Sequence, residues 1–129
     1  THCILAFHQA LVEFDEEGGV QGRGGRYRAN CDLLVSGMRQ LGFETLLPDN
    51  LQAPIIITFK MPADPAFNFQ TFYDGLSARG YVIYPGKLTV AESFRMGCIG
   101  RLNQEHMQGA LDAVTEGMRE MGVDSGTPD

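Results

Sequence analysis

Hydrophobic residues recur at two characteristic spacings along the chain. A period of three to four residues predicts helices over about 3–17, 20–41, 68–79 and 104–121. Shorter apolar or alternating runs predict strands over 55–59, 81–84 and 94–99. The resulting order, helix, helix, strand, helix, strand, strand, helix, predicts an α+β fold. We expect a small three-stranded, mainly antiparallel sheet covered by helices as a two-layer sandwich.

Several of these elements carry a finer pattern. In 20–41 and in 104–121 the apolar residues follow a 4-3-4-3 spacing, so each helix is expected to bury one face. Asn103 is placed to cap the start of the last helix. The continuous apolar run over 55–59 predicts a strand buried on both faces. The last residues, 123–129, are expected to form a polar tail.

Composition narrows the classes of function. The net charge is −6 and the pI is about 4.9, so binding to nucleic acid or to an anionic membrane is not expected. No apolar run reaches the roughly 18 residues that a membrane span needs. Cys3, Cys31 and Cys98 lack metal-type spacing, as do the three histidines, which predicts no metal site. Buried thiols in a reducing compartment, the cytoplasm, are the expectation.

Arg95 is the first candidate for a binding role. It lies in the middle of the last predicted strand, on the face that it shares with Gly97 and opposite to that of Phe94 and Met96. A glycine two residues along leaves room on that face for a ligand. A guanidinium fixed on a strand suits bidentate capture of a carboxylate. The residues alone leave this role and a salt bridge to a helix equally open.

Lys87 is a second candidate, because it follows the sharp turn at Pro85–Gly86. A lysine there serves either as an anion ligand or as an ordinary exposed loop residue, and its position favours the latter.

Three arginines lie between residues 23 and 28 of an otherwise acidic chain. We expect them to pair on a solvated helix face with acids such as Glu13 or Asp15. The glycine-rich run 22–25 precedes helical sequence, which favours a flexible helix start over a phosphate cradle.

Four segments, taken together and in order, resemble a known family. They are 16–20, 22–30, 84–89 and 94–100, and they are similar to the 2-aminoethylphosphonate–pyruvate transaminases, a family of class V, fold-type I aminotransferases that use pyridoxal phosphate. The resemblance covers residues 1 to about 122. The two later segments are its most specific part.

The resemblance implies that the chain is a fragment. Residues 1–122 are expected to be the C-terminal small domain, and 1–17 the helix connecting it to a missing large domain. The whole enzyme would be a homodimer that moves the amino group of 2-aminoethylphosphonate to pyruvate, giving phosphonoacetaldehyde and alanine in phosphonate catabolism. Pyridoxal 5'-phosphate would be bound mainly by the large domain.

The resemblance also assigns roles to single residues. Arg95 matches the arginine of an Arg-x-Gly-x-x-Gly strand that clamps the substrate carboxylate, with Gly97 as its first glycine. Gly86 and Lys87 match a loop near the active-site mouth, where they would make secondary contacts. Thr1 would adjoin a missing segment that contacts the cofactor phosphate. The lysine that carries the cofactor would lie upstream, so no catalytic residue is expected here and the fragment alone is expected to be inactive.

Two alternatives stay open. An alanine–glyoxylate or serine–pyruvate aminotransferase would use the same chemistry with another amino donor. A free-standing domain that binds a small molecule without catalysis would reuse only the fold. Such a free-standing domain should cover its apolar helix faces without help.

Overall fold

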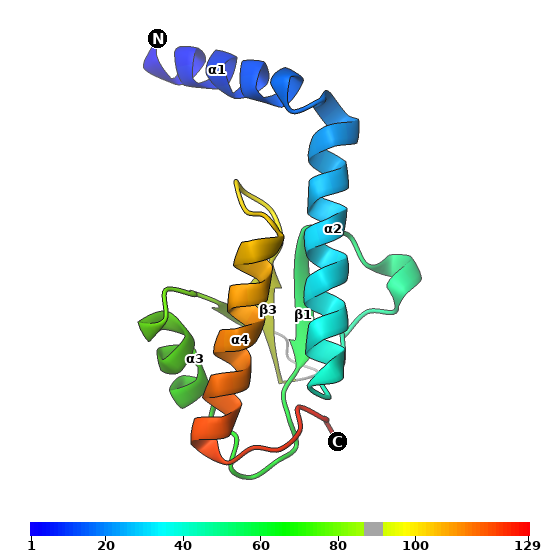
Figure 1. Cartoon of the computed structure of the whole chain (residues 1–129), viewed down its shortest axis with the longest axis vertical. Coiled ribbons are helices and arrows are strands. Elements are labelled where there is room, and N and C mark those ends of the chain that lie inside the picture. Colours follow the sequence, from blue (N-terminus) through cyan, green and yellow to red (C-terminus); the bar gives the residue numbers. More distant parts are fainter. Residues whose placement is uncertain (87–91) are drawn as a thin grey trace.

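Three antiparallel strands form a sheet with helices packed on one face in the computed structural model, which describes residues 1–86 and 92–129 (Figure 1). The elements are α1 (His2–Glu16), α2 (Gly19–Gln40), the short 3-10 helix η1 (Asp49–Leu51), β1 (Ile56–Lys60), α3 (Phe69–Ala78), β2 (Tyr84–Pro85), β3 (Ser93–Gly97) and α4 (Gln104–Met121). Their order and the two layers confirm the expected α+β fold. The prediction of a strand over 81–84 is wrong for residues 81–83, because only Tyr84 and Pro85 pair with β3.

The sheet places β3 in the centre, with β1 on one side and β2 on the other. Both neighbours run antiparallel to β3, and Arg95 lies opposite Thr58 of β1 and Tyr84 of β2. Residues directly opposite each other in antiparallel strands point to the same face of the sheet. Thr58, Tyr84 and Arg95 therefore share one face.

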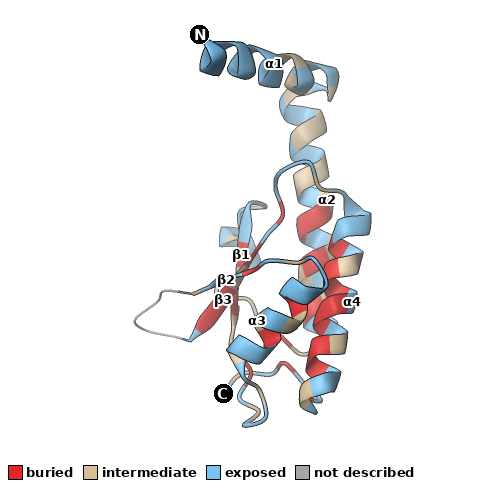
Figure 2. Cartoon of the chain, turned by 90° about the vertical axis from the view of Figure 1, so that its left-hand side faces the viewer, coloured by how far each residue is buried: buried red, intermediate tan, exposed pale blue. Residues whose placement is uncertain are grey.

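The helices cover only the other face of the sheet (Figure 2). In β3, Phe94 and Met96 are buried, whereas Arg95 is partly exposed and Gly97 is exposed, which confirms the predicted alternation. The prediction that the first strand is buried on both faces is wrong. Ile56 at the start of β1 keeps 38% of its surface exposed, because no helix packs on its side of the sheet.

Phenylalanine rings form the centre of the core. Phe43, Phe59, Phe72 and Phe94 are fully buried. The centroid of the Phe94 ring lies 5.7 Å from those of Phe43 and Phe59 and 5.6 Å from that of Phe72. Contacts at these distances are typical of favourable aromatic packing. Phe94 thus joins the central strand to the helical layer and to the neighbouring strand.

The helices α2 and α4 pack on the sheet through the faces that their periodicity predicts. Cys31, Leu34 and Met38 of α2 are buried, and so are Leu111 and Val114 of α4. Asn103 caps α4 through a bond from the backbone N–H of His106 to its side chain, as expected. Glycines 42, 80 and 122 follow their helices with positive φ and end them.

Helix α1 extends away from this body, and its main contact among the described elements is with α2 (Figure 1). None of its residues is buried. Its largest exposed apolar side chains are Ile4, Leu5, Phe7 and Leu11. Cys3 lies on the same helix and is exposed, so the expectation that all three cysteines are buried is wrong. The reason is that α1 has no second layer to pack against.

The other two cysteines are buried, as predicted. Burial raises the pKa of Cys98 to about 12 and also raises that of Cys31. Both side chains therefore remain neutral thiols at physiological pH.

Residues 123–129, expected to be a polar tail, run back along the body. Val123 is buried, and the N–H of Gly126 donates to the carbonyl oxygen of Leu41. The N–H of Ala63 donates in turn to the carbonyl of Thr127. This segment therefore closes the end of the core near Phe43. Among the described residues, every helix is too short or too polar to cross a lipid bilayer.

Replacing Phe94 by alanine should lower the free energy of unfolding by about 3–5 kcal/mol, because it leaves a cavity among three other rings. Urea unfolding followed by circular dichroism measures the change. Val82→Ala is the control, because Val82 is 63% exposed and its truncation should change stability by less than about 0.5 kcal/mol. Equal effects of the two substitutions would contradict the central place of Phe94 in the core.

Candidate functional site

Arg95 lies on the open face of the sheet, at the middle of the central strand. One terminal nitrogen, Nη2, donates to the carbonyl oxygen of Pro85 at 3.3 Å. Its Nε is buried and has no hydrogen-bond partner among the described residues. The guanidinium is thus held in place by the strand, while most of its donors remain unused.

No carboxylate in the described ranges forms an ion pair with Arg95. Six ion pairs are found among the described residues, and none of them includes Arg95. A salt bridge to a packed helix, the alternative that the sequence left open, is not found in these ranges, because the helices lie on the opposite face of the sheet. A partly buried guanidinium with unused donors is suited to bind a carboxylate or another oxyanion.

Two glycines lie close to Arg95, with different roles. A Cβ at Gly97 would meet nothing within 4 Å, so the face beside Arg95 is open there. Gly86 instead lies against β3: its N–H donates to the carbonyl of Ser93 at 2.7 Å, and a Cβ would stand 2.1 Å from Ser93 Oγ. Gly86 is therefore required by close packing, and its predicted substrate contact stays a prediction.

Sequence reasoning missed Ser93. Its hydroxyl is buried without a partner among the described residues, and it lies two residues before Arg95 on the same face of β3. The strand alternation could have indicated its face, but not its burial, which depends on the approach of Gly86. Lys87, the other candidate near this turn, lies outside the described residues.

Thr1 is not brought near Arg95. It is exposed at the outer end of α1, where its carbonyl accepts the N–H of Leu5 (Figure 1). Of the two lysines, Lys60 is the one that lies in the described ranges. Its ammonium is paired with Glu44 at 2.8 Å. In the described ranges, His, Cys, Asp and Glu side chains form no cluster of three that could hold a metal ion.

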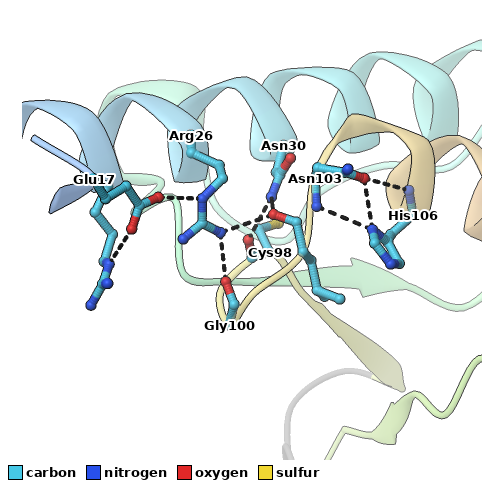
Figure 3. A network of polar contacts seen from close by, with 9 residues as sticks. Glu17, Arg26, Asn30, Cys98, Gly100, Asn103 and His106 are labelled. Atoms are coloured by element: carbon cyan, nitrogen blue, oxygen red, sulfur yellow. Dashed lines mark hydrogen bonds and ion pairs between the residues drawn. The ribbon is translucent and has the colours of Figure 1, made fainter. Parts of the chain in front are cut away.

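A polar network connects α1, α2 and the loop after β3 (Figure 3). The Nε atoms of Arg23 and Arg26 donate to the two carboxylate oxygens of Glu17, at 2.6 and 2.5 Å. Arg26 Nη1 also donates to the carbonyls of Gly100 and Leu102. The predicted partners Glu13 and Asp15 are wrong, because the chain turns between α1 and α2 so that Glu17 faces both arginines.

The turn between the helices explains the glycines. Gly18 and Gly19 both have positive φ, which glycine adopts without steric cost. A Cβ on Gly22 would lie 1.7 Å from the carbonyl oxygen of Glu17. The run 22–25 lies within the first two turns of α2 and is helical.

The two arginines change the acidity of Glu17. Hydrogen bonds from Arg26 and then Arg23 lower its pKa from 4.5 to about 2. The unfolded chain therefore binds a proton at this carboxylate before the folded chain does. The contribution of the network to stability is complete above pH 4.5 and is lost as the pH falls toward 2.

A pocket of about 680 Å³ lies beside this network. Its walls include Glu16, Glu17, Arg23, Arg26 and Arg101. Arg95 does not line it, and the two signs of charge in its walls largely balance. It therefore lacks the single-sign field that would concentrate an anionic substrate.

We expect the carboxyl carbon of Glu17, followed by NMR from pH 7 to pH 3, to report an ionised group throughout. Arg26→Ala should raise the titration midpoint toward 4.5, because the first-ranked donor to the carboxylate is removed. Arg28→Ala is the matched control: Arg28 is exposed on the same helix, and its loss should leave the midpoint unchanged. A wild-type midpoint near 4.5 would contradict the network.

Comparison with known proteins gives this geometry a context. No family model matches the chain. It is 53% identical over 124 residues to a 2-aminoethylphosphonate–pyruvate transaminase of Cupriavidus taiwanensis. The matched region covers 96% of this chain and 33% of that protein. The transaminase of the same description from Rhizobium meliloti is 54% identical over 128 residues, which covers 99% of this chain and 33% of that protein. The chain thus spans about a third of the length of the curated relatives that it matches.

Solved structures establish the fold. A ureidoglycine–glyoxylate aminotransferase from Bacillus subtilis matches 87% of this chain and 29% of its own, with a TM-score of 0.76 and 20% identity. An aspartate aminotransferase of subgroup IV from Thermus thermophilus matches 75% of this chain and 27% of its own, with a TM-score of 0.63 and 18% identity. The chain is therefore similar to the 2-aminoethylphosphonate–pyruvate transaminases over about a third of their length, and it shares its α+β fold with part of the two solved aminotransferases.

Proposed function

We propose that the chain is the C-terminal small domain of an aminotransferase that transfers the amino group of 2-aminoethylphosphonate to pyruvate. The products are phosphonoacetaldehyde and alanine. The observation that carries the proposal is Arg95, fixed on the open face of the sheet without a carboxylate partner in the described ranges. The chain is 53% and 54% identical to two proteins described as 2-aminoethylphosphonate–pyruvate transaminases, which supports 2-aminoethylphosphonate and pyruvate as the two substrates.

The role of Arg95 follows from its geometry. Its backbone is held in β3 by strands on both sides, and its Nη2 is fixed by the Pro85 carbonyl. The free edge of the guanidinium can then donate two parallel hydrogen bonds to the carboxylate of pyruvate or alanine. Because the strand sets the position of the arginine, binding also orients the carbon that exchanges its amino group.

We propose that pyridoxal phosphate is bound mainly outside the described residues. Lys60 is engaged by Glu44, and Thr1 lies at the far end of α1. The proposal therefore places the cofactor and its lysine in the rest of the protein. When bound there, pyridoxal phosphate supplies the electron sink that amino transfer requires.

The remaining features of the proposal concern the whole protein. We propose a cytoplasmic homodimer that acts in phosphonate catabolism, with small-molecule substrates and with the large domain as the direct partner of this one. The exposed apolar residues of α1 support such a partner. A free-standing binding domain should cover these side chains, and the described part of this chain leaves them open.

In the complete protein, Arg95→Ala should lower kcat/KM for pyruvate by about 100-fold, because two charge-assisted hydrogen bonds to the carboxylate are lost. Most of the change should be a rise in KM for pyruvate and for alanine. Steady-state kinetics in both directions measure it. Arg119→Ala is the control, since Arg119 is exposed and pairs with Glu116 on α4. Unchanged kinetics for Arg95→Ala would contradict the clamp.

The amino donor separates the proposal from the nearest alternative. A 2-aminoethylphosphonate–pyruvate transaminase should turn over 2-aminoethylphosphonate much faster than serine or alanine with glyoxylate. Initial rates for the three donors, with the complete protein loaded with cofactor, decide between them. Preference for serine or for alanine with glyoxylate would favour the alternative, and no transfer with any donor would favour a binding domain.

A further inference from the structure

Two side chains of α2 hold the loop that follows β3. Arg26 Nη1 donates to the carbonyls of Gly100 and Leu102 at 2.6 and 2.9 Å. Asn30 Nδ2 donates to the carbonyls of Cys98 and Leu102 at 3.2 and 3.0 Å. Residues four apart lie on one face of a helix, so both side chains reach the same loop (Figure 3). Three carbonyls of the loop thereby obtain donors that no strand provides.

This loop fixes one end of the strand that carries Arg95. Cys98 directly follows β3, and its N–H donates to the carbonyl of Ile55 beside β1. Beyond it the chain turns at Gly100, which has a φ of +87°, and enters α4. The position of the strand end along the sheet is therefore set by its bonds to β1 and by the donors of α2.

Arg26 also binds the end of α1. Its Nε donates to Glu17, the C-cap residue of α1, at 2.5 Å. Arg23 binds the second oxygen of that carboxylate, and its guanidinium lies 5.1 Å from the ring centre of Phe14 on α1. Between α1 and α2 the chain bends at Gly18 and Gly19, where glycine by itself allows many angles.

We infer that Arg26, oriented by Glu17, is a positioning residue for Arg95. It joins α1 to the loop after β3, and so it sets where the carboxylate clamp stands relative to the part of the protein attached through α1. This inference rests on the proposed function of Arg95. Lysine cannot replace Arg26, because a single ammonium cannot reach Glu17 and two loop carbonyls in one plane.

Burial in the network favours a positional role. Asn30 is completely buried, and its Oδ1 has no partner among the described residues. A buried amide oxygen without a donor destabilises the fold, and an apolar residue at this position would avoid that cost. Asn30 offsets this cost by donating hydrogen bonds to the carbonyls of Cys98 and Leu102.

A double-mutant cycle in the complete, cofactor-loaded protein tests the inference. Arg26→Ala and Arg26→Lys are each made with Arg95 present and with Arg95→Ala, and kcat/KM for pyruvate is measured. With Arg95 present, both should lower kcat/KM about tenfold, mainly through KM, because a misplaced clamp binds poorly. In the Arg95→Ala background, the same substitutions should change kcat/KM for pyruvate less than about twofold, because their effect acts through Arg95, which is then absent.

The controls separate the possible outcomes. Arg28→Ala, on the same helix but exposed, should leave kcat/KM unchanged. Equal losses with and without Arg95, or no loss in either case, would overturn the positioning role while leaving the clamp intact. If Arg95→Ala alone has no effect, the proposed function of Arg95 fails first, and the inference falls with it. Arg26→Lys keeps the charge and most of the side chain, so a folded variant remains available if Arg26→Ala does not fold.

Discussion

Burial of only one face of the sheet is the constraint on which the rest of the structure depends. Helices α2, α3 and α4 cover the side of β3 that carries Phe94 and Met96. Alternation along the strand then obliges Arg95 and Gly97 to point away from the helices. A charged side chain in a central strand is compatible with a core of closely packed phenylalanines only in this arrangement. Core packing and the exposure of the candidate clamp are therefore one consequence of the same pattern.

A second requirement arises where the strand ends. Carbonyl groups in the loop after β3 have no strand partner, and the buried and partly buried ones at Cys98 and Leu102 need other donors. Arg26 and Asn30 of α2 donate hydrogen bonds to these carbonyls. Arg26 also donates to the carboxylate of Glu17 at the end of α1. Gly22 allows α2 to start this close to the end of α1. The glycine-rich and arginine-rich segment thus serves geometry at a junction of three elements.

Much of this architecture could be predicted from residue spacing, because helical periodicity and strand alternation report directly on burial. The bounds of α2 and α4 and the facing of Arg95 were accessible in this way. The two-sided burial of β1 was predicted wrongly, since an apolar run such as Ile55–Ile57 does not reveal whether a second layer exists. The partner of Arg26 was also missed. It depends on the bend at Gly18 and Gly19, and φ angles of glycine cannot be deduced from composition.

The edges of the sheet have a consequence for self-association. Unpaired strand edges attract other chains, but in the described residues both edges are blunted. The outer side of β1 is occupied by the segment 44–46, through bonds from Leu46 N–H to Thr58 and from Lys60 N–H to Glu44. The strand β2 has two residues, and Pro85 has no N–H to offer. In the described residues, strand-to-strand growth into fibrils is thus disfavoured, and the exposed apolar side chains of α1 offer a different surface for self-association.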